Sequence, residues 1–227
     1  MREFRTLVLV AVASGTLAGL VWFAGQYFAL IPLIQRAETY EAAHEAAHGA
    51  AVHQEEGWKP KDGWQRNSLT ALATVLTGIG QAAILFGLVF LSRCRIDARK
   101  GSLWGLTAFV CFNLAPALGL PPQPPGVPVA NLVDRQVWWA ATVVATGTGI
   151  YVIAAPRTSW LLKIGGGICL ALPHAIGAPG AAGESIVPGQ LIRQFAILSL
   201  VAACIFWLTL GIVGGFLCDR YMSRADN

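Results

Sequence analysis

Charged residues are scarce in this chain, and their scarcity excludes an ordinary soluble domain. Asp, Glu, Lys and Arg make up 12% of its 227 residues, whereas a soluble globular domain carries roughly 25%. Apolar residues make up 55% of the chain, and the mean hydropathy is +0.57. The composition therefore predicts a membrane protein.

Two further absences narrow the function. None of the five cysteines lies in 35–67, the only sizeable polar segment, so we expect no disulfide framework outside the membrane. The chain also has no G-x-x-x-x-G-K-[ST] sequence, the motif of an ATP-binding loop. The sequence thus shows neither an energy source of its own nor a motif for a resident cofactor.

Apolar runs of membrane-spanning length fill most of the chain. A bilayer core of about 30 Å needs about 20 predominantly apolar residues per helix. We expect an all-α, polytopic membrane protein with about six transmembrane helices in a single membrane domain, 1–227. The first run continues well past the signal-peptide-like Ala11-Val12-Ala13, so we expect an uncleaved helix. The predicted helices are 6–34, 68–92, 103–120, 136–155, 160–176 and 194–217.

The distribution of Lys and Arg predicts the orientation. The side that holds both termini carries ten basic residues and four acids, and the other side carries six basic residues and eight acids. Because basic residues favour the cytoplasmic side, we expect both termini in the cytoplasm, the polar loop 35–67 outside, and a multi-pass protein of the inner (cell) membrane. The formal net charge of +4 follows from this topology and predicts no nucleic-acid partner.

His44, Glu45 and His48 form an H-E-x-x-H sequence in the outside loop, which is the signature of zinc proteases. A protease also needs a third ligand and a walled cleft. The extended motif would place Gly at 51 and His at 54, but this chain has Ala51 and Gln54. No soluble domain is present to build a cleft. We therefore predict no catalytic residue and no enzyme.

Metal capture suits the same loop better. Because residues four apart share a helical face, Glu41, His44 and His48 can line one side of a helix. Imidazole favours divalent transition metals, and carboxylates add negative charge. We predict transient binding of Co²⁺ or a similar ion, with no permanently bound cofactor; a solvated, Ala-rich helix explains the pattern equally well. The candidate ligands in the loop are Glu38, Glu41, His44, His48 and His53.

Two polar residues stand near the outer ends of predicted helices. His174 lies in "LPHAIG" and Asn113 in "CFNLAP". Ionisable residues at membrane depth are costly and are often functional, although a histidine that bonds a neighbouring carbonyl is a structural alternative. We predict that His174 is a metal ligand and that Asn113 lines the pathway, both facing a shared polar vestibule.

Two outside connections have similar sequences. "LAPALGLPPQPPG" follows the third helix and "ALPHAIGAPGAAGE" follows the fifth. Proline ends helices, and irregular backbone at membrane depth requires protein or a watery cavity beside it. Small residues four apart, such as Gly15 and Gly19, predict close helix packing.

Several stretches resemble the CbtA family, the predicted cobalt-transporter subunit. The most specific are the Pro-Gly run after the third helix and the Arg135-Gln136-x-Trp138-Trp139 start of the fourth. The resemblance implies cobalt uptake and a small, His-rich, single-helix membrane partner of the CbtB type. The matching stretches are "IPLIQRAETYE", "EEGWKPKDGWQR", "ATVLTGIGQA", "FNLAPALGLPPQPPG", "DRQVWWAATVVATGTGIY" and "LPHAIGAP".

We therefore expect a membrane subunit of a divalent-metal uptake system, most simply for cobalt, which captures the ion in the 35–67 loop and passes it through the helix bundle. Its partners would be the metal ion, membrane lipid and the CbtB-type subunit. The alternative is a non-transporting accessory subunit that packs into a larger complex through its glycine faces and the Trp138-Trp139 pair. Helix centres almost free of ionisable residues favour this alternative, because proton-driven transporters usually contain more.

Overall fold

The computed structural model describes residues 2–48, 60–92 and 94–223, and the chain is helical with no strand in these ranges. The first element is one continuous helix. α1 (Arg2–Gly25) runs through a π-helical turn, η1 (Gln26–Leu30), into α2 (Ile31–His48). A helix of this length, at 1.5 Å per residue, far exceeds a bilayer core of about 30 Å. The first half of the predicted 35–67 loop is therefore an extension of the first helix.

The other helices follow in the predicted order. α6 begins four residues before the predicted position and α8 five residues before. Of the described helices, four are long and apolar enough to cross a membrane, and α7 is a shorter apolar helix. The prediction of an all-α membrane protein is confirmed. The elements are α3 (Trp64–Leu91), α4 (Ala98–Phe109), η2 (Val110–Leu114), α5 (Ala115–Ala117), α6 (Leu132–Ala154), α7 (Trp160–Ile176) and α8 (Gly189–Ser223).

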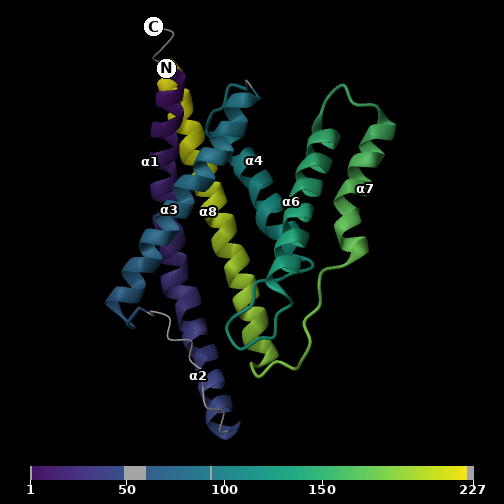
Figure 1. Cartoon of the computed structure of the whole chain (residues 1–227). Helices are drawn as coiled ribbons and strands as arrows, with labels where there is room; N and C mark the ends of the chain where they lie inside the picture. Colours follow the sequence, from purple (N-terminus) through teal and green to yellow (C-terminus); the bar gives the residue numbers. More distant parts are fainter. Residues whose placement is uncertain (1, 49–59, 93, 224–227) are drawn as a thin grey trace.

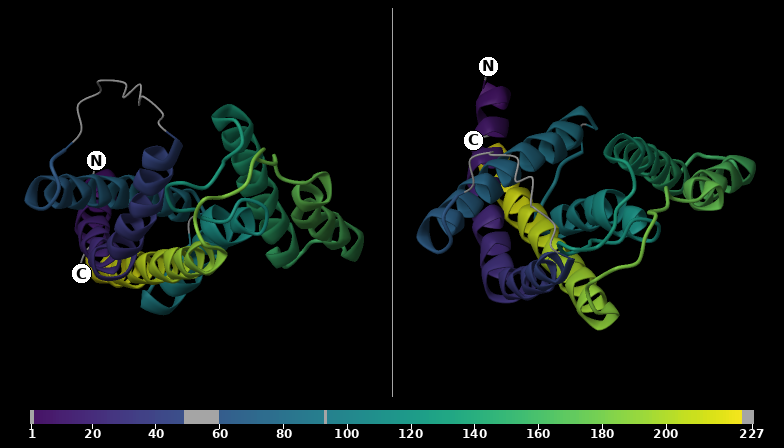
Figure 2. Two further views of the ribbon diagram at one scale, coloured as in Figure 1. Left: turned by 90° about the horizontal axis from the view of Figure 1, so that it is seen from below. Right: turned by 60° about the horizontal axis from the view of Figure 1, so that its bottom comes forward.

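The helices form a main bundle with a hairpin beside it. α1 packs against α3 and α8, and α4 packs against α8. α6 and α7 pair with each other, and α6 meets the main bundle mainly at η2 and α5. Figure 1 shows both termini at one end, and the views of Figure 2 show the α6–α7 hairpin to one side. We call the end opposite the termini the distal end; it carries α2 and the connections 118–131 and 177–188.

Glycine pairs set the closest helix contacts. A Cβ added at Gly15 would lie 2.5 Å from the Cα of Ile79, and one at Gly19 would lie 2.8 Å from the Cα of Val75. At the α4–α8 crossing, a Cβ on Gly101 would collide with the carbonyl oxygen of Gly211. Small residues allow backbones to approach closely in lipid, where the hydrophobic effect cannot drive helix association. These glycines serve packing inside the chain.

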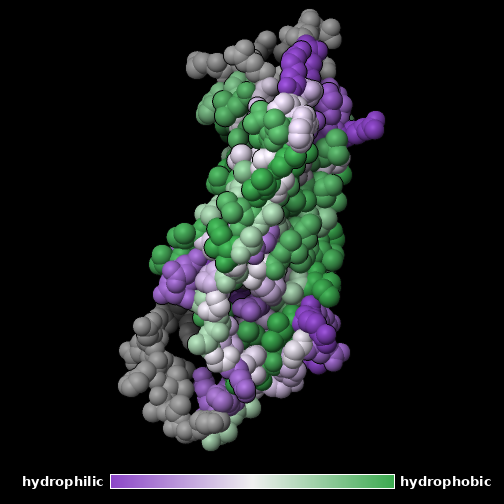
Figure 3. All heavy atoms as spheres, turned by 90° about the vertical axis from the view of Figure 1, so that its right-hand side faces the viewer, coloured by the Kyte–Doolittle hydropathy of each residue, from purple (hydrophilic) through white to green (hydrophobic). Residues whose placement is uncertain are grey.

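The surface has the hydropathy pattern of a membrane protein. On the face shown in Figure 3, hydrophobic residues cover the middle, and hydrophilic residues gather towards the two ends. Among the described residues, the buried polar side chains are Ser14, Thr74, Thr142 and Thr146, all uncharged. Ser14 and Thr142 donate to helix carbonyls four residues earlier, at 2.6 and 2.8 Å. The interior thus satisfies most of its hydroxyls locally and holds no buried charge in these ranges.

Candidate functional site

α2 carries four of the predicted capture residues. Its helical period places Glu41 and His44 on one face, and His48 is the last residue of the helix. Glu41 is half-buried and His44 is exposed. The helix thus turns this face from the protein towards solvent at the distal end. His53, the fifth predicted residue of the loop, lies outside the described residues.

Glu38 is engaged in an ion pair. Its Oε1 lies 2.7 Å from an Arg66 guanidinium nitrogen, and its Oε2 lies 3.4 Å from the other terminal nitrogen of Arg66. The same guanidinium also contacts Asp62 at 3.0 Å. Two-pronged contacts between arginine and a carboxylate fix the relative orientation of the two groups and also stabilise their charges. Arg66 therefore ties α2 to the start of α3, and Glu38 would have to leave this pair to bind a metal.

A small apolar cluster holds α2 at the distal end. Ala37 is fully buried with Val187 and Leu191, from the 177–188 connection and α8. One turn further along, the side chain of Glu41 lies against Gly126, where an added Cβ would be 3.0 Å from the Glu41 Cγ. Gly126 has φ +78°, a conformation that favours glycine. The two proline-rich connections thus support the base of α2, which we call the capture helix.

A cavity of about 310 Å³ lies beside the ion pair. The π-helical turn η1 contributes Tyr27 and Phe28 to its wall, and Gln35, Arg66 and Asn67 add polar groups. π-Helical turns inside α-helices often occur at functional sites. The cavity therefore offers polar space next to the base of α2.

No metal cluster is assembled in the parts of the chain that the structure describes: nowhere in them do three His, Cys, Asp or Glu side chains come together around one point. Capture by Glu41, His44 and His48 remains a prediction from their shared face, and a complete ligand set would need water or a partner.

Asn113 lies on the π-helical turn η2 and has a tryptophan partner. Its Oδ1 accepts a hydrogen bond from the indole Nε1 of Trp207 on α8 at 2.7 Å. The preceding residue, Phe112, stacks on the Trp207 ring with centroids 5.5 Å apart. The Phe112 carbonyl accepts from Trp139 Nε1 at 3.2 Å. η2 is thus the point at which α4, α6 and α8 meet.

His174 lies in the last turn of α7, against another tryptophan. Its ring meets Trp138 edge to face, with centroids 5.9 Å apart. Trp138 is buried and donates from Nε1 to the Pro173 carbonyl at 3.3 Å. The structure thus gives His174 and Asn113 different partners on different helices, and it records no contact between them.

The Trp138-Trp139 pair has a role that the sequence did not reveal. The two side chains point to opposite neighbours: Trp138 reaches α7 and Trp139 reaches η2. Gly119 leaves room for Trp138, because a Cβ there would collide with the indole ring. Trp138 is therefore used inside the chain, which removes it from the docking surface of the accessory-subunit alternative. Two adjacent tryptophans at the start of a helix are visible in the sequence, but which residues they contact depends on the fold.

Comparison with known proteins gives one family. The family model described as probable cobalt transporter subunit (CbtA) matches residues 4–219. No curated protein and no solved structure matches the chain. The match spans nearly the whole chain and includes every described candidate residue.

Proposed function

The chain belongs to the CbtA family, and from that premise we propose that it is the membrane subunit of a cobalt uptake system in the inner membrane. The observation that carries the proposal is the family match over residues 4–219. The four long apolar helices and the shorter α7 support a position within the bilayer. Co²⁺ is the cargo, so no resident metal is required.

Capture begins at the distal end. α2 continues the first helix beyond the length needed to cross a bilayer, and the sequence spacing of Glu41, His44 and His48 suits one helical face. Neutral imidazole and carboxylate favour Co²⁺ and Ni²⁺ over Mg²⁺ and Ca²⁺. A site with two histidines and one carboxylate on an exposed helix binds weakly and exchanges quickly, which suits delivery of an ion to the bundle.

His174 is the first residue that the ion would contact after it leaves the capture helix. It lies at the distal end of α7, where its contact with Trp138 fixes one side of its ring. Asn113 stands at the corresponding end of the α4–η2–α5 segment, with its amide oxygen held by Trp207. We propose that Asn113 contributes mainly by fixing η2, and that His174 contacts the ion.

The H-E-x-x-H sequence is part of this capture helix, and the protein is not an enzyme. His44 and Glu45 are exposed on α2, and neither lines the cavity beside Arg66. A zinc protease needs a substrate cleft around its metal, and α2 offers an open helical face.

An accessory role without transport is the second candidate. The described interior holds no buried charge, whereas ion-translocating pathways usually contain ionisable groups. In this alternative, His44 and His48 would be surface residues, and the bundle would support a partner such as a CbtB-type single helix.

Cobalt accumulation separates the two candidates. Cells that lack the chain are compared with cells that express it, using radioactive cobalt at limiting concentration, with and without the partner subunit. We expect accumulation to fall to the background level without the chain. Accumulation that stays unchanged when the chain is removed would reject transport and favour the accessory role.

A further inference from the structure

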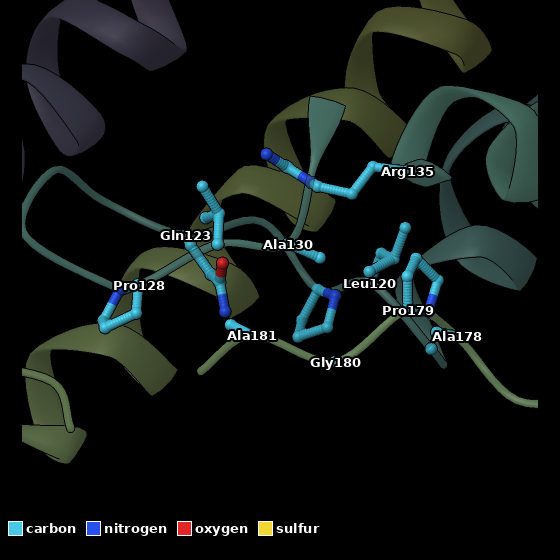
Figure 4. A pocket seen from close by; sticks show the side chains of 12 residues that line it. Leu120, Gln123, Pro128, Ala130, Arg135, Ala178, Pro179, Gly180 and Ala181 are labelled. Carbon is cyan, nitrogen blue, oxygen red and sulfur yellow. The ribbon is translucent and has the colours of Figure 1, made fainter. Parts of the chain in front are cut away.

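The two proline-rich connections enclose a second cavity, of about 230 Å³. The 118–131 connection forms one part of the wall and residues 178–181 form another, while Arg135 extends over it from the first turn of α6. In Figure 4 the Arg135 side chain reaches along the upper edge of the cavity towards the side on which Gln123 lies, and Ala178 and Pro179 lie on the other side. The cavity is separate from the capture helix and from the space beside Arg66.

The charge on the cavity wall is positive. Arg135 is its one charged lining residue, Gln123 adds an amide, and no carboxylate lines it. Among the described residues, the Arg135 guanidinium has neither a hydrogen-bond nor an ion-pair partner. A guanidinium repels divalent cations, so this cavity is unsuited to metal, and its fork of donors matches the oxygens of an anion.

The N-terminal end of α6 and the cavity wall both favour a negatively charged ligand. Arg135 belongs to the N-terminal turn of α6, a helix of 23 residues, and such an end carries partial positive charge. Prolines 121, 128 and 179 line the cavity and have no backbone N–H to offer. Among the lining side chains, only Arg135 and Gln123 carry hydrogen-bond donors, which suits one small oxyanion group.

We propose that this distal cavity binds a single phosphate group, held by the Arg135 fork and the Gln123 amide. The cavity lies at the ends of apolar helices, where lipid phosphates are abundant. Leu118, Leu132 and Val133 are exposed apolar residues close in sequence to the lining residues Gly119 and Arg135, and they would accept acyl chains. Phosphate from a phospholipid headgroup and free inorganic phosphate share this chemistry. The site is independent of the proposed cobalt route.

The test uses the purified full-length chain and measures both sources of phosphate. Native mass spectrometry counts the phosphatidylglycerol molecules retained after release from phosphatidylglycerol nanodiscs. In a maltoside detergent that lacks phosphate, ³¹P line broadening measures inorganic phosphate binding. The variants are Arg135→Gln, Gln123→Ala and, as matched control, Arg193→Gln, an exposed arginine in the first part of α8 outside the cavity wall.

We expect Arg135→Gln to weaken binding about tenfold, which corresponds to about 1.4 kcal/mol, because the variant loses a charge-assisted hydrogen bond. Gln123→Ala should weaken it less, and Arg193→Gln should match the parent. Loss confined to retained lipid identifies a headgroup site, and loss confined to ³¹P broadening identifies free phosphate. Equal loss in Arg135→Gln and Arg193→Gln, or no loss in Arg135→Gln and Gln123→Ala, would overturn the proposal. If Arg135→Gln does not yield folded protein, Gln123→Ala decides.

Discussion

The candidate metal ligands fall into two kinds of environment. His44 is exposed on the capture helix, whereas His174 lies against the buried Trp138 ring. Exposed ligands exchange their ions readily, and a ligand fixed by an aromatic neighbour presents a defined direction to an arriving ion. The two environments suit capture and entry, respectively.

Removing both histidines of the capture helix, His44 and His48, should abolish cobalt binding there. We expect His44→Ala/His48→Ala to lose cobalt binding measured by isothermal titration calorimetry on the purified chain. Thr39→Ala, an exposed change on the same helix, should bind like the parent. Unaltered affinity in the double variant would remove these histidines from the route.

Releasing Glu38 should change affinity more than stability. Arg66→Gln breaks the contacts to Glu38 and Asp62, and partly exposed ion pairs contribute about 0–1 kcal/mol. We expect a small fall in the thermal unfolding midpoint and tighter cobalt binding, because a carboxylate becomes available next to the capture face. Weaker binding after this substitution would show that the ion pair positions α2 and that Glu38 is not a ligand.

At the scale of elements, glycine crossings hold the main bundle together. Gly101 meets Gly211 so closely that even one methyl group has no space between α4 and α8. The α6–α7 hairpin has a glycine crossing of its own, because a Cβ added at Gly149 would lie 2.7 Å from the carbonyl oxygen of Gly166. In both parts of the molecule, a larger side chain should therefore be costly at a helix crossing and tolerated at a glycine that faces open space, and these two cases differ.

A pair of glycine substitutions measures this difference. Gly101→Ala should destabilise the chain by about 1–3 kcal/mol, the usual cost of overpacking, seen as a lower midpoint by tryptophan fluorescence in detergent. Gly147→Ala should be neutral or slightly stabilising, because no atom lies within 4 Å of the added Cβ and alanine favours helices. Equal midpoints in the two variants would contradict the packing of α4 on α8.

The sequence predicted the helices better than it predicted their partners. Apolar runs identify spans directly, but 35–48 is Ala-rich and polar, so the pattern alone did not decide that the first helix continues to His48. Gly15 and Gly19 were recognisable as packing residues, yet a small residue does not specify which helix it meets, and the close approach of Gly101 to Gly211 was not predicted. The partners of Asn113 and His174 depend on Trp207 and Trp138, which only the folded arrangement brings to them.

At the scale of the whole molecule, the charge distribution and the helix order agree. The termini lie together at one end (Figure 1), and the connections with fewer basic residues lie at the other. The positive-inside rule then predicts that the distal end lies outside the cytoplasm. Capture at α2 requires this orientation, because an uptake protein must meet its ion on the outer side.

Reporter fusions test the orientation directly. A reporter inserted after Lys100, or fused after Asn227, should report the cytoplasm, and one inserted near His53 should report the outer side. Each insertion is checked for cobalt accumulation, so that only folded chains are counted. A cytoplasmic signal near His53 would reverse the topology and exclude capture by α2.

We propose that cobalt passes from the capture helix to His174. The most direct measurement is initial cobalt uptake against cobalt concentration, in cells that express the parent, His44→Ala/His48→Ala or His174→Ala at equal membrane levels. The capture variant should need more cobalt for half-maximal uptake and approach the parental rate at high concentration. The His174 variant should still bind cobalt at the capture helix, yet its cobalt uptake should stay at the background level at every concentration. Uptake curves in both variants that coincide with the parental curve would contradict the route.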